Sequence, residues 1–398
     1  MSNFSVLLDA KRPVKVWIPD ADLVLDEKTK QQALAVADLP FVFKHVALMP
    51  DTHQGFGVPI GCVFASQHYV VPNAVGVDIG CGILAACLNL YKDQVFDRLD
   101  LIRTGISELV PVGFDTHAEP QRFDDFDEDY FVYFDSSVFS ELRRELDLAS
   151  YQIGTLGGGN HFIELQVDEL DRVWVMIHSG SRHFGYWIAS YFNRRAKEFN
   201  ELWFSDVSGS DLNFLPLNIY TGKSYRFMHD VAMRFAQRNR AVMLDAVISV
   251  LMDVIDREVL VDVQFDVPHN YMRFENHFGR NVLVHRKGAI CAREDLIGVI
   301  PGSMGSKSYV VRGLGNFESF TSASHGAGRI LGRRQAKREL SLEEQQALLR
   351  EIGSVTELTV SQLDEAPSAY KNIDDVMRNQ ADLVSIVHEL RPLLTIKG

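Results

Sequence analysis

Residues 69–88 read YVVPNAVGVDIGCGILAACL and place a carboxylate and a thiol in a glycine-rich loop between two apolar runs. Asp78 and Cys81 are three residues apart, and glycines flank the thiol on both sides. Glycine tolerates positive φ and lets a ligand approach the backbone closely. A thiolate binds soft and borderline metal ions, and a carboxylate adds negative charge to the same site. The loop therefore predicts a metal centre, although a loop aspartate beside a buried structural cysteine explains it equally well in isolation.

The composition narrows the class of protein. The chain has 398 residues, 46% of them hydrophobic, which is enough for a large core in one big domain or two. A net charge of −13 argues against non-specific coating of nucleic acid, although a local basic groove can still bind phosphate. The four cysteines form no CxxC pair, which favours a reduced, cytoplasmic protein. The sequence has no signal-like apolar start and no run long enough to span a bilayer, so we expect no membrane partner.

Local patterns predict both strands and helices. Short apolar runs punctuated by Pro and Gly indicate strands, and they cover residues 14–18, 41–49, 62–65, 83–88 and 173–177. Helical spacing of apolar residues predicts a long amphipathic helix over residues 228–255. Ser341 and Glu344 have the spacing of a capping box that opens another helix. Apolar residues between Ile373 and Leu390 predict a last helix running to Pro392.

Residues 113–137 differ from the rest of the chain because they are acidic, aromatic and poor in aliphatic side chains. We interpret this segment as an exposed surface loop or lid. The sequence shows no linker, internal repeat or low-complexity tract, and candidate site segments are scattered from residue 51 to residue 325. These observations favour a single α+β domain over residues 1–398, with a central β-rich site surrounded by helices.

Four histidines lie in unusual local settings: His161, His178, His269 and His325. The first follows Gly157-Gly158-Gly159-Asn160, whose free backbone N–H groups can cradle an anion. The second ends a predicted strand and precedes small residues and an arginine, a setting that suits a metal ligand beside a phosphate. Taken singly, each could instead be a buried histidine with satisfied hydrogen bonds, or a turn residue.

Two further glycine-rich segments resemble phosphate cradles: residues 301–308, PGSMGSKS, and residues 322–329, SASHGAGR. The first lacks the Walker A spacing. In the second, small neighbours leave the His325 ring accessible, and histidine can act as a nucleophile toward phosphorus. Asp51 and His53 would share one face of a strand, where they could orient other groups. Together, these segments suit two metal ions that share a bridging thiolate beside a nucleotide.

In this order, the segments resemble the RtcB family of RNA ligases. The matching stretches are PFVFKHVALMPDTHQGFG, VGVDIGCG, LGGGNHFIE, HSGSR, HNY, RKGA, PGSMGSKSYVVRGLGN, SHGAGR and the final Lys397-Gly398. The resemblance covers the chain from about residue 13 to its end. It implies a large RtcB-like domain.

The resemblance also implies an activity and a set of site residues. The family joins an RNA end with a 3′-phosphate or 2′,3′-cyclic phosphate to a 5′-hydroxyl end, using GTP and Mn²⁺, in RNA repair or tRNA splicing. His325 would be the nucleophile that carries GMP, and Asp51 would orient its ring. The implied ligands of two Mn²⁺ ions are Asp78, Cys81, His161, His178 and His269, with Cys81 bridging. The implied nucleotide contacts are Asn160, Glu164, Asn270, Pro301, Gly302, Ser303, Met304, Ser308, Gly326, Ala327, Gly328 and Lys397, with Glu164 reading the guanine edge.

The implied partners are tRNA or rRNA fragments with such ends, and the need for a helper protein stays open. This sequence departs from the family at Phe56, where many members have Tyr or Lys, and in the acidic segment 113–137, which would repel RNA phosphate. Basic residues remain candidates for RNA contact: Lys11, Arg12, Lys44, Arg182, Arg280, Arg286, Lys287, Arg312, Arg329, Arg333, Arg334, Lys337 and Arg338.

Two other functions compete with ligation. A metal-dependent RNA phosphodiesterase or cyclic-phosphate hydrolase would use the same metal ligands, but it needs no guanylylation site such as His325. A non-catalytic RNA-binding subunit would not need the complete set of ligands that the sequence retains.

Overall fold

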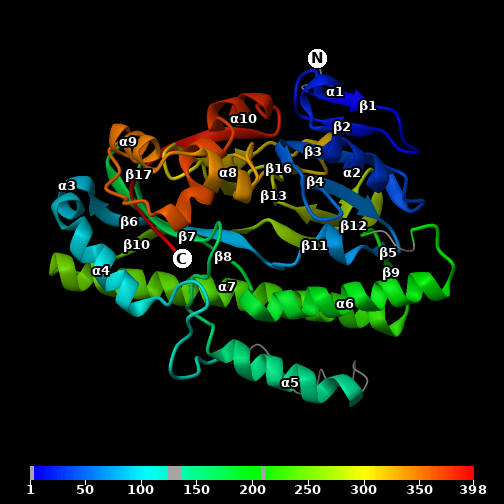
Figure 1. The fold of residues 1–398 in the computed structure, drawn as a ribbon, viewed down its shortest axis with the longest axis horizontal. Helices are drawn as coiled ribbons and strands as arrows, with labels where there is room; N and C mark the ends of the chain where they lie inside the picture. The colour runs from blue at the N-terminus through cyan, green and yellow to red at the C-terminus, as the bar shows by residue number, and fades with distance from the viewer. Residues whose placement is uncertain (1–3, 124–135, 208–210) are drawn as a thin grey trace.

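The computed structural model describes residues 4–123, 136–207 and 211–398. Two large sheets form its centre (Figure 1). The six-stranded sheet has, in spatial order, β1 (Ser5–Leu7), β2 (Val14–Val16), β3 (Val42–His53), β4 (Ile60–Ser66), β12 (Arg280–Lys287) and β11 (Asn270–His277). The seven-stranded sheet has β10 (Val261–Pro268), β6 (Gly82–Tyr91), β8 (Arg172–Ser179), β7 (Phe162–Val167), β17 (Val384–Lys397), β15 (Ser308–Gly313) and β14 (Ile297–Ile300). Two small sheets pair β13 (Ala289–Cys291) with β16 (Ser322–Ser324), and β5 (Tyr69–Val70) with β9 (Leu215–Pro216).

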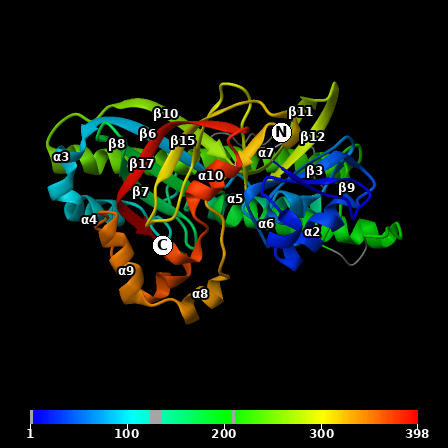
Figure 2. The same ribbon diagram turned by 90° about the horizontal axis from the view of Figure 1, so that it is seen from above.

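Helices surround these sheets. They are α1 (Ala21–Val24), α2 (Glu27–Ala37), α3 (Lys92–Val95), α4 (Leu99–Leu109), α5 (Ser136–Ser150), α6 (Arg182–Leu202), α7 (Tyr220–Ile255), α8 (Arg333–Glu339), α9 (Leu342–Glu351) and α10 (Ile373–Asn379). Figure 1 shows α6 and α7 running along one side of the sheets, with α8, α9 and α10 on the other side. Seen from above in Figure 2, β17 crosses the molecule beside β7 and β15, with which it pairs. In the described part of the chain, no helix is both long and apolar enough to cross a bilayer.

The alternation of side chains along β6 explains the layered core. Ile83 and Ala85 face a core that also contains Ala47 and Met49 of β3, so this core lies between the two large sheets. Leu84, like Ala86 and Leu88, faces a second core with residues of α4 and α7. Successive residues of a strand point to opposite faces, so an apolar strand such as β6 is buried on both sides. The shared core is compatible with one domain over residues 1–398, which remains our interpretation.

The structure confirms most of the predicted elements. The strand-like runs lie in β2, β3, β4, β6 and β8. The long amphipathic helix is α7, which begins eight residues before Met228, at Tyr220. Ser341 caps α9, accepting a hydrogen bond from the backbone N–H of Glu344 at 3.5 Å.

The last predicted helix is wrong beyond Asn379. Helix α10 ends there, and residues 384–397 form strand β17, which pairs with β15 and β7. The apolar spacing was compatible with a helix, but Val384, Ile386 and Val387 are β-branched and suit a strand. Backbone pairing on both edges, which no local pattern reveals, decides the conformation.

Only part of the acidic segment can be compared with its prediction. Residues 113–123 form no helix or strand and are mostly exposed, as expected for a loop. Residues 124–135, which include the acidic run, lie outside the described residues. The last two residues of the predicted loop, 136 and 137, instead begin helix α5.

Candidate metal and nucleotide site

Strand register brings the predicted metal ligands together at the ends of neighbouring strands in the seven-stranded sheet. Gly82, directly after Cys81, pairs with Pro268 of β10 and with Ser179 of β8. His178 pairs with Phe162, the first residue of β7. The four neighbouring strands β10, β6, β8 and β7 therefore place the thiol and the imidazoles next to one another, although they are up to 188 residues apart in the chain.

The five predicted ligands form two groups that share the thiol. Asp78, Cys81 and His161 make one group, and Cys81, His178 and His269 make the other, with all ligand atoms of a group within 4.8 Å of one another. The Cys81 Sγ lies 3.5 Å from His161 Nε2 and 3.2 Å from His178 Nε2. His161 Nε2 is 3.0 Å from Asp78 Oδ2, and His178 Nε2 is 3.4 Å from His269 Nε2.

Backbone carbonyls set the tautomer of two of these rings. His161 Nδ1 donates to the Leu156 carbonyl at 2.9 Å, and His178 Nδ1 donates to the Asn160 carbonyl at 3.0 Å. A carbonyl oxygen only accepts, so each Nδ1 carries the proton and each Nε2 presents a lone pair to the cluster. Such contacts are typical of metal-binding histidines.

The electrostatics of the cluster also suit a cation. Burial, reinforced by neighbouring rings, holds the pKa values of His178 and His269 well below 6.5, so both imidazoles are neutral. Burial and the charge of Asp78 raise the pKa of the Cys81 thiol well above 9.0. Burial opposes ionisation of Asp78, but its hydrogen bond with His161 keeps its pKa below 3.8. A thiol, three imidazoles and a carboxylate are together a donor set for borderline divalent ions.

Two polar residues of α7 form hydrogen bonds with the backbone of the loops that carry the predicted metal ligands. Arg240, which is 1% exposed, donates to the carbonyls of Gly80 and Ser179 at 2.8 and 2.7 Å and forms a two-bond ion pair with Asp266. Asn239 donates to the Gly180 carbonyl and accepts from the backbone of residues 154 and 155. The sequence analysis missed both, and their only signal was a polar pair interrupting the apolar face of a long helix.

His325 lies next to the metal-ligand cluster. Its ring centroid is 4.7 Å from that of His269. The buried carboxylate of Asp51 accepts from His325 Nδ1 at 2.6 Å and from the His325 backbone N–H at 3.1 Å. Burial opposes the charge on Asp51, but the interaction with His325 lowers its pKa below 3.8. Since Nδ1 is held by the Asp51 carboxylate, Nε2 is the ring nitrogen left for contact with a ligand in the pocket.

Lys371 and Gly328 hold the backbone around Asp51. Lys371 Nζ donates to the carbonyls of Pro50 and Thr52 at 3.1 and 2.6 Å. A Cβ at Gly328, where φ is +76°, would lie 2.1 Å from the Asp51 carbonyl oxygen. A side chain at residue 328 would therefore push β3 away from the His325 loop.

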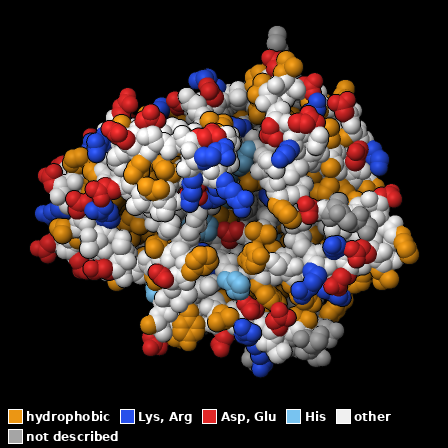
Figure 3. Space-filling model, in the orientation of Figure 1, with side chains coloured by type: hydrophobic (Ala, Val, Ile, Leu, Met, Phe, Trp, Pro, Cys, Tyr) orange, Lys and Arg blue, Asp and Glu red, His pale blue; other side chains and the backbone are white. Residues whose placement is uncertain are grey.

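A pocket of about 720 Å³ opens beside His325. Most of the predicted nucleotide residues line it: Asn160, Glu164, Pro301, Gly302, Ser303, Met304, Gly326, Ala327, Gly328 and Lys397. This volume is in the range of small-molecule sites. Figure 3 shows a hollow near the centre of this face, with Lys and Arg side chains gathered above it.

Two predicted nucleotide residues lie behind the wall of this pocket. Ser308 accepts from the backbone N–H of Gly302 at 3.2 Å and so supports the 301–304 turn. Asn270 donates to the Asp78 carbonyl and accepts from the Gly288 N–H, so it braces the metal-ligand loop.

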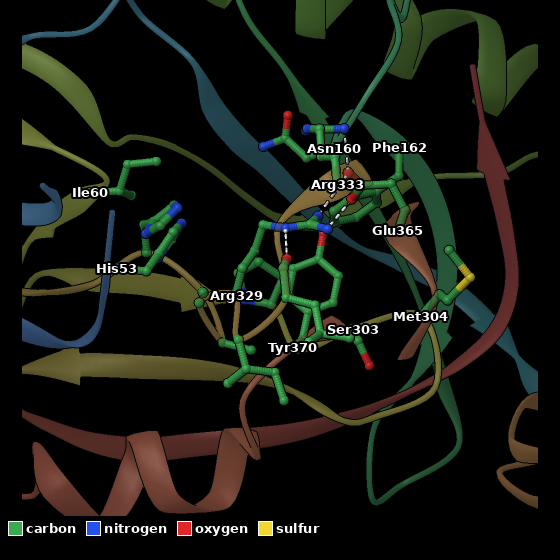
Figure 4. A pocket seen from close by; sticks show the side chains of 18 of the residues that line it. His53, Ile60, Asn160, Phe162, Ser303, Met304, Arg329, Arg333, Glu365 and Tyr370 are labelled. Carbon is green, nitrogen blue, oxygen red and sulfur yellow. Dashed lines mark hydrogen bonds and ion pairs between the residues drawn. The ribbon is translucent and has the colours of Figure 1, made fainter. Parts of the chain in front are cut away.

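The inner end of the pocket combines carboxylates with cations. Glu164 accepts from Thr395 Oγ1 at 2.5 Å and from Gln166, and burial raises its pKa to about 7. Lys397 donates to Glu365 at 3.2 Å. Figure 4 shows Glu365 beside Arg333 and Tyr370 in this pocket. Glu365 and Tyr370 were not among the predicted residues, and nothing local in the sequence distinguishes them.

The structure changes the set of candidate RNA contacts. Arg286 is fully buried and pairs with Glu275, so its prediction as an RNA contact is wrong. Arg329 is turned inward to Glu365, with its side chain 14% exposed. Arg333 likewise pairs with Asp364 and Glu365. On helix α8, the side chains of Lys337 and Arg338 are 48 and 73% exposed and remain candidates.

The fold and site define a protein in which a cluster of side chains able to hold a metal ion and a carboxylate-paired histidine lie beside one ligand-sized pocket. The family model described as tRNA-splicing ligase RtcB matches residues 32–131 and 135–398. The chain is 38% identical to the RNA-splicing ligase RtcB of Escherichia coli (strain K12), with all of both chains covered. It is 31% identical to the tRNA-splicing ligase RtcB of Nanoarchaeum equitans, with 97% of this chain and 95% of that protein covered. It is 30% identical to the RNA-splicing ligase RtcB of Mycobacterium tuberculosis, with 92% of this chain and all of that protein covered. The chain therefore belongs to the RtcB family.

Proposed function

We propose that this protein is a GTP- and Mn²⁺-dependent RNA ligase that joins 3′-phosphate or 2′,3′-cyclic phosphate ends to 5′-hydroxyl ends. The observation that carries the proposal is the contact between the His269 and His325 rings, because it joins a metal-capable cluster to a nucleophile inside one pocket. The names of the relatives, RNA-splicing ligase and tRNA-splicing ligase, support a role in RNA splicing. Our proposed substrates are tRNA or rRNA fragments. Four free cysteines suit work in the reducing cytoplasm.

In the proposed reaction, the Nε2 lone pair of His325 attacks the α-phosphorus of GTP. A P–N bond forms, the bridging P–O bond to the β-phosphate breaks, and pyrophosphate leaves. Asp51 retains the hydrogen bond from Nδ1 and stabilises the positive charge that develops on the ring. A 2′,3′-cyclic phosphate end is first hydrolysed by water, which breaks the bond from phosphorus to O2′ and leaves a 3′-phosphate and a 2′-hydroxyl. An oxygen of the RNA 3′-phosphate then takes the GMP and frees Nε2. The RNA 5′-hydroxyl finally attacks that 3′-phosphate, loses its proton and displaces GMP.

Two Mn²⁺ ions would be held by the two ligand groups that share Cys81, and they would neutralise phosphate charge and orient the in-line displacements. The other residues bind and orient. Asn160 and the 301–304 turn line the pocket where a nucleotide would lie. Glu164 offers its carboxylate to the N1 and N2 hydrogens of guanine, which are donors. Lys337 and Arg338 of α8 would receive RNA phosphates, since exposed cations attract the nucleic-acid backbone.

Incubation with α-³²P-labelled GTP and Mn²⁺, followed by a denaturing gel, tests the proposal. The ligase predicts an acid-labile labelled protein band that disappears in His325→Ala. His388→Ala is the matched control, because His388 lies on the surface against Glu169 and does not line the pocket. A hydrolase predicts no label but opens a 2′,3′-cyclic phosphate.

A second assay uses a cleaved RNA hairpin with a 3′-phosphate and a 5′-hydroxyl. The ligase predicts a joined product, whereas a non-catalytic subunit binds the RNA and gives neither label nor product. A panel of tRNA and rRNA fragments then tests whether the acidic segment 113–137 narrows the choice of RNA. Equal rates across the panel would contradict that narrowing.

A further inference from the structure

One buried carboxylate, that of Glu365, forms ion pairs with three cationic side chains at the inner end of the pocket. Glu365 is 3% exposed. It accepts hydrogen bonds from Arg329 at 3.1 Å, from Lys397 at 3.2 Å and from the Tyr370 hydroxyl, and it forms an ion pair with Arg333 at 2.6 Å. The charges of these cations outweigh the effect of burial and hold the pKa of Glu365 below 4.5. A carboxylate with this many partners has little freedom to rotate.

The two oxygens of Glu365 divide these partners. Oε1 receives both guanidinium groups, those of Arg329 and Arg333, whereas Oε2 receives Lys397 Nζ and the Tyr370 hydroxyl. The arginines are in turn held by residue 364, since Arg333 pairs with its carboxylate and Arg329 donates to its carbonyl. The arginine side therefore anchors the carboxylate, and the other oxygen points at the lysine.

Lys397 lies in surroundings that suit a nucleobase better than a phosphate. Its side chain is 8% exposed, and its Nζ lies 5.9 Å from the centroid of the Phe162 ring. Phe162, Met304 and Glu164 line the same pocket. An aromatic ring and a thioether offer flat apolar surface to a base. The Glu164 carboxylate would repel a phosphate but accepts N–H donors, so this end offers both an acceptor and a cationic donor.

Guanine and adenine differ in what they present to such a pair. Guanine carries a 6-keto acceptor beside its N1–H donor, whereas adenine carries a 6-amino donor beside an N1 acceptor. An ammonium group donates only, so it bonds the keto oxygen and leaves the 6-amino group unpaired. A site built to make a hydrogen bond discriminates strongly against a ligand that cannot complete it.

We propose that Glu365 is a positioning residue for the nucleobase, holding Lys397 as a charged donor toward the 6-keto group and so setting the preference for guanine over adenine. This inference rests on the proposed function, because it takes the pocket to bind GTP. Burial alone favours a neutral amine at Lys397, and the charge of Glu365 opposes that loss. Without the carboxylate, Lys397 loses both the charge that favours its protonated form and the hydrogen bond that orients its ammonium group.

The test measures binding of GTP, ITP and ATP by equilibrium dialysis with Mn²⁺, using protein that carries His325→Ala so that no covalent adduct forms. ITP and ATP both lack the 2-amino group, so their affinity ratio reports the 6-position and N1. GTP and ITP differ only in the 2-amino group, so their ratio reports the side that we assign to Glu164. Glu365→Gln removes the charge, and Glu365→Asp keeps the charge but withdraws it by one methylene. Circular dichroism confirms that each variant is folded.

Glu275→Gln is the matched control. Glu275 is also a buried carboxylate paired with an arginine, Arg286, but it does not line the pocket. It therefore reproduces the structural cost of neutralising a buried ion pair. We expect its three nucleotide affinities to match those of the His325→Ala parent.

In the folded Glu365 variants, we expect the ITP-to-ATP affinity ratio to fall at least about fivefold, the effect of losing one charge-assisted hydrogen bond. The GTP-to-ITP ratio should stay within about twofold, because the contact at the 2-amino group is untouched. An unchanged ITP-to-ATP ratio in Glu365→Asp, or an equal fall in Glu275→Gln, would overturn the inference. If Glu365→Gln does not fold, Glu365→Asp alone decides. Absence of any GTP label on the protein with His325 intact would instead overturn the proposed function.

Discussion

Replacing Arg240 by methionine tests whether this side chain supports the loops that carry the predicted metal ligands. A loss of metal affinity would report that support, and the free energy of unfolding reports the effect on stability. The guanidinium donates to the carbonyls of Gly80 and Ser179, which lie next to Cys81 and His178 in the chain, and it pairs with Asp266 through two bonds of 2.7 Å. Arg240→Met fills much of the same volume but leaves two buried carbonyls and the Asp266 carboxylate without their donor. Breaking a buried ion pair by removing one partner costs about 3–5 kcal/mol of unfolding free energy.

The same loss should weaken metal binding. Contacts that orient metal ligands typically contribute about 10–100-fold in metal affinity. We therefore expect the Mn²⁺ dissociation constant of folded Arg240→Met, measured by electron paramagnetic resonance titration, to rise by about 10–100-fold. Urea unfolding monitored by circular dichroism gives the change in stability and the folded fraction.

Arg286→Met is the control for this prediction. Arg286 is also fully buried and also forms a two-bond ion pair, with Glu275, and it donates to the Phe320 carbonyl. Its loss should cost a similar ~3–5 kcal/mol but leave Mn²⁺ affinity within about threefold of the unaltered protein. Two results would refute the reasoning: unchanged Mn²⁺ affinity in folded Arg240→Met, or an equal loss of affinity in Arg286→Met.

The remaining predictions concern the cluster, the nucleophile and the base pocket. Cys81→Ala removes the ligand common to both groups, so inductively coupled plasma measurement should find less than one Mn²⁺ per chain, and two bound ions would refute sharing. Asp51→Asn disturbs the tautomer of His325 and should slow GMP labelling by about 10²–10⁴-fold with Mn²⁺ content unchanged, whereas a loss of less than tenfold would contradict the role of the carboxylate. Glu164 has a pKa of about 7, raised by burial, so the folded protein holds this proton more tightly than the unfolded chain. Its contribution to stability is present at low pH and is lost as pH rises toward 7, by about 2 kcal/mol between pH 5.5 and pH 8. Urea unfolding of the metal-free protein should show that this part of the pH dependence is absent in Glu164→Gln, and identical pH profiles would argue against the shift.

Some features of the site followed from local sequence because their chemistry is local. Glycines around Cys81 and before His161 distinguished these residues in the sequence, and the alternation and β-branching of the strand runs placed them at strand ends. The five predicted ligands do converge, with Cys81 common to both groups. The hydrogen bond between Asp51 and His325 was also anticipated, although only from the resemblance.

Tertiary structure decided which charges are paired and which segments are strands. Arg286 looked available for RNA, yet it is buried against Glu275 on the neighbouring strand. Residues 384–392 were predicted as the end of a helix but lie in strand β17, since two neighbouring strands satisfy its backbone groups.

The sequence by itself therefore determined which chemical groups the site has: a thiol, imidazoles and carboxylates in glycine-rich loops. Residue type and neighbouring glycines can be read directly from short stretches of the chain. Only the fold decided that Arg240 would brace the two ligand loops and that Glu365 would hold Lys397. Such contacts join residues 32 to 160 positions apart. They depend on strand register and helix packing, so no periodicity along the chain can reveal them.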